Sequence, residues 1–97
     1  MEQQKPLIKW SAEAIDDLKA IYYNLLLRNS PENALKIRNE IFLAARNIIF
    51  PEQFQVDEFY NKYRRIIIRN YKVLYSIDGR IINITSVISS YQDSSKQ

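Results

Sequence analysis

The sequence predicts an α+β domain in which a short N-terminal strand precedes an α-helical hairpin and an antiparallel β-meander. In the first half of the chain, apolar residues recur with the helical period. Over residues 63–88, β-branched and aromatic residues dominate and alternate with polar ones. Asp78-Gly79 and Arg69-Asn70 offer two tight turns within that region, since Gly and Asn tolerate positive φ. The helices should therefore come first, and the meander should follow them.

A short strand at residues 7–10 and a helix at residues 12–28 are the first expected elements. Ser11 is a favourable N-cap for the helix. Trp10, at the junction, is expected to be a packing anchor rather than a stacking platform. The helix should bury one apolar stripe, made of Ala14, Leu18, Ile21 and Leu25 and joined by Ile15, Tyr22 and Leu26.

A second helix is expected from Pro31 to about Ile49. Ser30 suits its N-cap, Pro31 suits the first helical position, and Pro51 stops the helix because the residue before a proline disfavours the helical region. Two helices joined this closely should pack as an antiparallel hairpin. The core stripe of the second helix is expected to be Ala34, Ile37, Ile41, Ala44 and Ile48.

Residues 50–62 form the least regular segment, which we interpret as a loop folded onto the domain. Residues 56–60 carry a weak pattern for an edge strand. In the meander, Tyr71 and Tyr75 share an apolar face with Val73 and Ile77 and are expected in the core. The opposite, mixed face carries Lys72 and Leu74, and the last strand should place Ile82, Ile84 and Ile88 on one side.

Length and composition indicate one domain over residues 1–97, with residues 93–97 frayed. The absence of cysteine from the sequence excludes disulfides, thiolate metal sites and a cysteine nucleophile. We expect no metal and no cofactor. There is no apolar run near twenty residues and no signal-peptide pattern, so we expect a cytoplasmic protein without a membrane association.

Charge is distributed unevenly along the chain, although the net charge is only +3. Residues 1–60 hold seven Lys or Arg against nine Asp or Glu, whereas residues 61–97 hold seven against two. The sheet half should therefore attract phosphates or an acidic protein segment. Its candidate cations also have ordinary interpretations: Arg64 and Arg65 point to opposite strand faces, so one of them can pair with Asp57 or Glu58, while Arg69 and Lys72 near a hairpin tip are solvated charges.

The order and spacing of several short motifs resemble the RelE/ParE family of bacterial type II toxins, over nearly the whole chain. These motifs are Ile8-Lys9-Trp10-Ser11-Ala12-Glu13-Ala14 with Asp17-Leu18, Pro31-Glu32-Asn33-Ala34, and Tyr63-Arg64-Arg65-Ile66-Ile67-Ile68 running into Tyr71-Lys72-Val73-Leu74-Tyr75. The resemblance implies a two-layer fold with the helix hairpin on one face of the sheet and function on the opposite, concave face. It also implies an antitoxin partner that wraps around the toxin.

Two activities known in the family lead to different expectations. RelE-type cleavage of messenger RNA on the ribosome needs a base, cations and an acid. Here Arg64, Arg65 and Arg69, with Lys62 and Lys72, could supply the cations, and Tyr91 could supply a proton. The acid–base set is incomplete, since the sequence has no histidine and carries Ser89-Ser90 where many such members have His or Arg. The ParE-like branch inhibits DNA gyrase and has no known catalytic set, so the resemblance to it is closer.

Three hypotheses follow in this order: a toxin that binds and inhibits gyrase, a ribosome-dependent messenger RNA endonuclease, and a non-toxic relative that still binds an antitoxin. We expect an acidic antitoxin segment to dock along the sheet half and to neutralise Arg64 or Arg65 together with Arg69. The expected set of target-binding or antitoxin-binding residues is Lys62, Arg64, Arg65, Arg69, Lys72, Leu74 and Tyr91.

Overall fold

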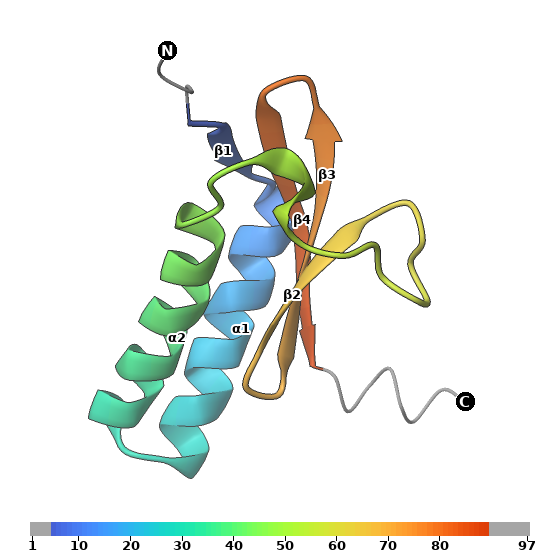
Figure 1. The fold of residues 1–97 in the computed structure, drawn as a ribbon. Helices are drawn as coiled ribbons and strands as arrows, with labels where there is room; N and C mark the ends of the chain where they lie inside the picture. Colours follow the sequence, from blue (N-terminus) through green and yellow to red (C-terminus); the bar gives the residue numbers. More distant parts are fainter. Residues whose placement is uncertain (1–4, 90–97) are drawn as a thin grey trace.

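The computed structural model describes residues 5–89 and has the predicted order of elements (Figure 1). Tyr91 and the expected frayed end, residues 93–97, lie outside the described residues. No helix in the described part is long and apolar enough to cross a membrane. The elements are β1 (Leu7–Trp10), α1 (Ala12–Arg28), α2 (Pro31–Arg46), the 3₁₀ turn η1 (Pro51–Gln53), β2 (Arg64–Ile68), β3 (Tyr71–Asp78) and β4 (Ile81–Ser89).

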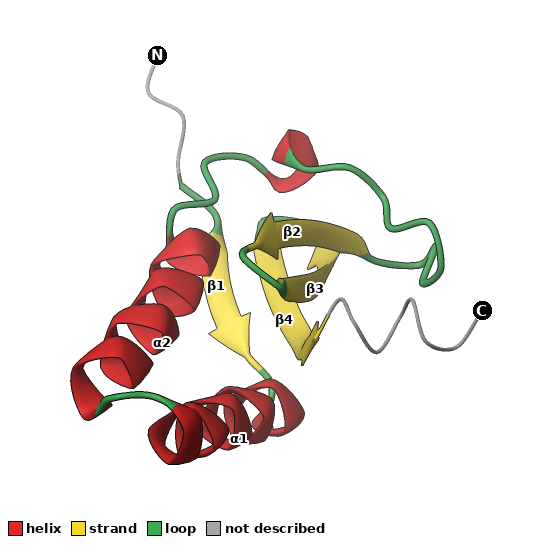
Figure 2. Cartoon of the chain, turned by 90° about the horizontal axis from the view of Figure 1, so that it is seen from below, coloured by secondary structure: helices red, strands yellow, loops and turns green. Residues whose placement is uncertain are grey.

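The four strands form one sheet in the order β1-β4-β3-β2. The predicted meander is confirmed, because β2, β3 and β4 pair antiparallel, while β1 pairs parallel with β4. The two helices lie together on one side of the strands (Figure 2), with α1 against β4 and α2 reaching β2. The expected α+β fold with a helix layer and a sheet layer is therefore confirmed. We call the sheet face turned away from the helices the outer face.

Both helices begin at their predicted serine caps. The Ser11 hydroxyl accepts a hydrogen bond from the Ala14 amide at 2.9 Å, and the Ser30 hydroxyl accepts one from the Asn33 amide at 3.1 Å. The predicted end of α2 near Ile49 was too late, since α2 ends at Arg46. The Gln53 side chain accepts a hydrogen bond from the Ile49 amide at 2.7 Å, which removes that donor from any continuing helix.

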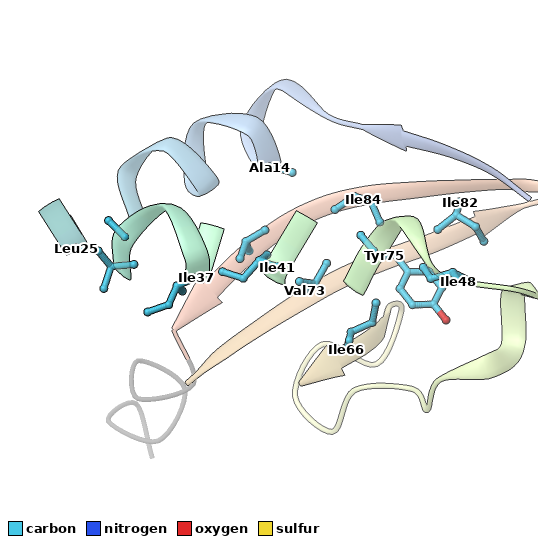
Figure 3. Close-up of a cluster of buried hydrophobic side chains, with 13 residues drawn as sticks. Ala14, Leu25, Ile37, Ile41, Ile48, Ile66, Val73, Tyr75, Ile82 and Ile84 are labelled. Atoms are coloured by element: carbon cyan, nitrogen blue, oxygen red, sulfur yellow. The ribbon is translucent and has the colours of Figure 1, made fainter. Parts of the chain in front are cut away.

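The predicted stripes match the core with two corrections. Ala45, not Ala44, is the fully buried alanine near the end of α2, and Ile15 on α1 is 42% exposed. Ile15 lies one residue past Ala14, and therefore about 100° around the helix, which turns it away from the sheet. Figure 3 shows Ile41 from the helix layer beside Val73 and Ile84 from the sheet. These three side chains belong to the hydrophobic core.

The two hairpin turns fall close to their predicted places. Ile68 pairs with Tyr71, so Arg69-Asn70 is the first turn, but the positive φ of 54° is at Arg69 and not at Asn70. Asp78 pairs with Ile81, so the second turn is Gly79-Arg80, one residue later than predicted. Gly79 has a φ of 61°, which a residue without Cβ adopts with little strain.

A bulge in β4 explains why one predicted inward residue points outward. Leu74 pairs with Ser86 and Tyr75 pairs with Ile84, which leaves Thr85 as an extra residue. The Thr85 hydroxyl donates to the Leu74 carbonyl at 3.1 Å. One inserted residue inverts the alternation of a strand, so Val87 enters the core and the prediction of Ile88 on the Ile82–Ile84 side was wrong.

Candidate functional site

The loop before β2 folds back along the start of that strand. The Arg65 amide donates to the Gln55 carbonyl at 3.0 Å, the Asp57 amide donates to the Tyr63 carbonyl at 2.9 Å, and Val56 forms an isolated antiparallel bridge with Arg64. The weak strand pattern at residues 56–60 therefore reduces to one bridging residue. The chain turns away because the Asp57 carboxylate accepts hydrogen bonds from the amides of Phe59 and Tyr60, both at 2.9 Å.

Asp57 is also the centre of a buried group of charges on the outer face. Its carboxylate lies 2.7 Å from the Lys72 ammonium and 3.5 Å from the Arg65 guanidinium. Burial raises the pKa of the Asp57 carboxyl, but the hydrogen bonds from Lys72 and from the amides of Tyr60 and Phe59 outweigh it and hold this pKa below its ordinary value. The carboxylate thus stays charged and fastens the loop to β2 and β3.

The interpretation of Lys72 as a solvated charge was wrong, since Lys72 is only 4% exposed. Its ammonium lies 5.3 Å from the centre of the Phe59 ring, which covers it from the loop side. Leu74, expected on a binding surface, is 3% exposed. Both faces of β3 are therefore largely buried, one by the helices and the other by the loop. The loop can cover Lys72 because it supplies the Asp57 carboxylate as a partner.

The three candidate arginines go to three different partners. Arg65 pairs with Asp57 and, at 3.9 Å, with Glu58, as the ordinary interpretation expected. Arg64, opposite Tyr75 in the register, donates to the Phe54 carbonyl at 2.7 Å. Arg69 is held by the Glu40 carboxylate of α2 through two hydrogen bonds of 2.6 and 2.9 Å.

The Arg69–Glu40 contact shifts both ionisations in the stabilising direction. The hydrogen bond from Arg69 lowers the pKa of the Glu40 carboxyl, and the same bond raises the pKa of the Arg69 guanidinium. Lys62, in contrast, is an exposed residue of the loop. The structure therefore does not gather the predicted cations into one site. Within residues 5–89, no three His, Cys, Asp or Glu side chains come together as metal ligands.

The outer face carries a hollow of about 340 Å³ between the loop and the start of α1. Its walls come from the loop and from α1, and its floor comes from β3 and from β4 at the bulge. The sequence analysis did not predict this hollow, because it depends on the Thr85 bulge and on the fastened loop. The lining residues are Glu13, Tyr60, Tyr63, Leu74, Thr85, Ser86 and Ile88.

A larger open groove of about 650 Å³ runs between α1 and α2, and Trp10 of β1 also lines it. Trp10 stacks on Phe42 with ring centres 5.7 Å apart, and the Arg38 guanidinium lies 5.6 Å from the centre of the Tyr22 ring. Trp10 is thus a packing residue, but it also lines this groove. The full lining is Trp10, Ile15, Leu18, Lys19, Tyr22, Tyr23, Arg38, Asn39 and Phe42.

The groove was not predicted, because three of its apolar residues, Ile15, Leu18 and Tyr22, were assigned to the buried stripe of α1. Ile15, Tyr23 and Phe42 are 42%, 60% and 40% exposed. The width of the apolar surface on α1 could have indicated the groove from the sequence. Ile15, Tyr22 and Tyr23 extend it beyond the four positions that a single buried stripe requires. These exposed apolar side chains make the groove a candidate surface for the binding of another molecule.

Comparison with known proteins gives one family and several structures of the same fold. The model of the family described as the ParE toxin of the type II toxin–antitoxin system, parDE, matches residues 8–93. No curated protein matches the chain.

Among solved structures, the chain is similar to one from the chromosomal ParDE system of P. aeruginosa, with 20% sequence identity and a TM-score of 0.70 over 88% of this chain and 96% of that one. A conserved hypothetical protein of Helicobacter pylori shares 16% identity at a TM-score of 0.56, over 89% of this chain and 96% of its own. A chain of the RelB-RelE antitoxin–toxin complex from Methanococcus jannaschii shares 18% identity at a TM-score of 0.52, over 91% and 96%. At these identities the structures establish a shared fold.

Proposed function

Because this chain belongs to the ParE toxin family of type II toxin–antitoxin systems, we propose that it is a toxin that binds and inhibits DNA gyrase in the cytoplasm and is neutralised by a cognate antitoxin. Family membership supplies the class of protein. The choice of gyrase as the target, and of binding rather than cleavage as the mode of action, is our proposal.

The engagement of the candidate catalytic arginines is the observation that favours binding over RNA cleavage. Arg65 is held by Asp57, Arg69 by Glu40, and Arg64 by the Phe54 carbonyl. A cation that stabilises a developing phosphorane charge must be directed at the reacting phosphate. Each of these guanidiniums is instead directed at a group of the protein. The sequence also lacks histidine, the most common general acid or base.

Ribosome-dependent cleavage of messenger RNA is the alternative, and it would need these contacts to exchange for contacts with RNA. Similarity to the RelB-RelE complex supports the fold and not this chemistry, at 18% identity. A non-toxic relative that only binds an antitoxin is the remaining alternative, and a growth assay separates it from the other two.

For the antitoxin, we propose the groove between α1 and α2 as the principal docking site. Its exposed apolar side chains suit the apolar face of an amphipathic helix, and Lys19 and Arg38 in its lining suit acidic residues beside that face. We propose strand β2, which carries Arg64 and Arg65, and its flanking residues Lys62 and Arg69 as the basic strand that contacts the target. There Lys62 is exposed, whereas Arg64, Arg65 and Arg69 would have to exchange an internal partner for an external one.

Induced expression in growing cells tests the proposed function. We expect growth to stop with filamentation and a DNA-damage response while incorporation of labelled amino acids continues at first. Co-expression of the antitoxin should restore growth. Immediate arrest of protein synthesis with cut transcripts would favour the RNA-cleaving alternative, and normal growth with a folded protein would favour the non-toxic relative.

A further inference from the structure

We propose that the hollow on the outer face receives an arginine or lysine side chain of the toxin's protein target. The inference rests on the proposed function, because it specifies what the target must present. Three features of residues 5–89 support it: the Glu13 carboxylate, which has no partner among them, the two tyrosines in the lining, and the contacts that hold the loop.

Glu13 supplies the negative charge of the hollow. It is an exposed residue in the first turn of α1 and lines the hollow. In the described part of the chain, its carboxylate makes no hydrogen bond or ion pair. Of the cations on the outer face, Arg65 and Lys72 both turn to Asp57. The hollow therefore brings the carboxylate of Glu13, from the acidic part of the chain, against strands that belong to its basic part.

The rest of the lining suits the remaining parts of a basic side chain. Tyr60 and Tyr63 line the hollow, and the faces of aromatic rings attract ammonium and guanidinium groups. Leu74 and Ile88 provide apolar surface for the aliphatic stem of lysine or arginine. The volume of about 340 Å³ lies near the lower end of binding sites for small ligands, which are roughly 300–1,000 Å³. A single long side chain is an occupant of suitable size.

The hollow is built before a partner arrives. The Asp57 carboxylate accepts a hydrogen bond from the Tyr60 amide, and the Tyr63 amide donates to the Tyr60 carbonyl at 2.9 Å. Since Asp57 also pairs with Lys72 of β3, the loop wall of the hollow is attached to the sheet. Across the hollow, the Ser11 hydroxyl donates to the Thr85 carbonyl at 3.0 Å and joins α1 to the bulge. A preformed site of this kind loses less conformational entropy when it is occupied.

The charge of the lining opposes RNA as the occupant. Among residues 5–89, no lysine or arginine lines the hollow, and the carboxylate of Glu13 would repel a phosphate. Removal of this charge should therefore weaken action on a protein target that inserts a basic side chain. The same change should strengthen action on RNA, so the sign of the effect identifies the class of target.

Titration of ¹⁵N-labelled toxin with N-acetyl-arginine amide tests the hollow directly. We expect saturable chemical-shift changes of the Leu74, Ser86 and Ile88 amides, and none with N-acetyl-citrulline amide, which has the same shape without the charge. Glu13→Gln should weaken this binding about tenfold, as expected for loss of a charged hydrogen bond. Glu32→Gln is the matched control, because Glu32 occupies the first turn of α2 and does not line the hollow.

The same two variants are then compared for inhibition of gyrase supercoiling. We expect Glu13→Gln to require a higher toxin concentration than the parent, and Glu32→Gln to match it. Three results would overturn the inference: equal binding of the citrulline probe, chemical-shift changes elsewhere on the protein, or a Glu13→Gln variant that is indistinguishable from Glu32→Gln. None of them would affect gyrase inhibition by the parent toxin. Conversely, specific arginine binding by a toxin that does not inhibit gyrase would refute the proposed target and not the hollow.

Discussion

The ammonium of Lys72 lies 2.7 Å from the carboxylate of Asp57, and their side chains are 5% and 0% exposed. Together they join a loop with little regular structure to the middle of the sheet. A buried ion pair contributes little net stability relative to an apolar pair. Removing one partner, however, leaves the other charge buried and without compensation. The loop and the wall of the hollow therefore depend on this pair.

Replacing Asp57 with Asn should destabilise the fold by about 3–5 kcal/mol, because Lys72 is left buried without its counter-charge. Urea unfolding at neutral pH measures this loss. Glu58→Gln is the matched control, since Glu58 is 72% exposed and lies 3.9 Å from Arg65. The control should stay within about 0.5 kcal/mol of the parent. Equal stabilities for the two variants would show that the buried pair does not hold the loop.

Acid should weaken the fold through the same carboxyl. Because the folded chain holds the Asp57 pKa below its ordinary value of 3.8, the unfolded chain takes up the proton first as the pH falls. The contribution of Asp57 is thus present above that value and is lost as the pH falls through the folded pKa; Glu40 shifts in the same direction. The free energy of unfolding should fall less steeply below about pH 5 in Asp57→Asn than in Glu58→Gln.

Arg69 has a strained backbone conformation and a side chain that binds α2. Its φ of 54° disfavours any residue with a Cβ, while its guanidinium holds Glu40 of α2. Arg69→Ala loses the contact and keeps the strain, whereas Arg69→Gly loses the contact and relieves the strain. We expect Arg69→Gly to unfold at a higher urea concentration than Arg69→Ala. The opposite order would mean that this turn adopts another conformation in solution.

Phe42→Ala should weaken antitoxin binding more than it weakens the fold, because Phe42 is 40% exposed and lines the groove. Truncation of an aromatic residue at the centre of an interface often costs about 2 kcal/mol or more of binding free energy. Calorimetric titration with the antitoxin measures this change. Leu27→Ala is a suitable control, since Leu27 is 86% exposed on α1 and does not line the groove.

Charge reversal on the sheet half distinguishes the groove from the basic strand as the antitoxin site. If the antitoxin instead masks Arg64, Arg65 or Arg69, reversing those charges one at a time should weaken its binding, and association should slow as salt rises. If the folded charge-reversal variants keep their antitoxin affinity and Phe42→Ala loses affinity, the groove is supported as the antitoxin site. Lower affinity in the reversal variants alone would contradict it.

Much of the fold could be predicted because local signals agreed with one another. Ser11 and Ser30 are efficient caps, and the periods of 3.6 and 2 residues separate helices from strands. The bulge at Thr85 could not be predicted, because the residues around it keep an alternating pattern that fits a regular strand equally well. Two tertiary contacts accompany the bulge: the Ser11 hydroxyl donates to the Thr85 carbonyl, and the Asp17 carboxylate accepts a hydrogen bond from the Val87 amide at 2.9 Å.

The candidate site was less predictable, because it depends on which charges meet. Pairing of Arg65 with Asp57 or Glu58 was expected from their nearness in sequence. The burial of Lys72 was not, since a lysine beside a hairpin turn is usually solvated and only the folded-back loop covers it. Arg69 and Glu40 are separated by 29 positions in the chain, so nothing local indicates their contact.

We propose that this toxin acts by binding gyrase and not by cutting RNA. The most direct measurement adds purified, folded toxin to two reactions in parallel: gyrase supercoiling of relaxed plasmid, and primer-extension analysis of messenger RNA on translating ribosomes. We expect the toxin to inhibit supercoiling in proportion to its concentration and the antitoxin to restore it, while the messenger RNA in the parallel reaction stays intact. Uninhibited supercoiling together with new, ribosome-dependent transcript ends would contradict it.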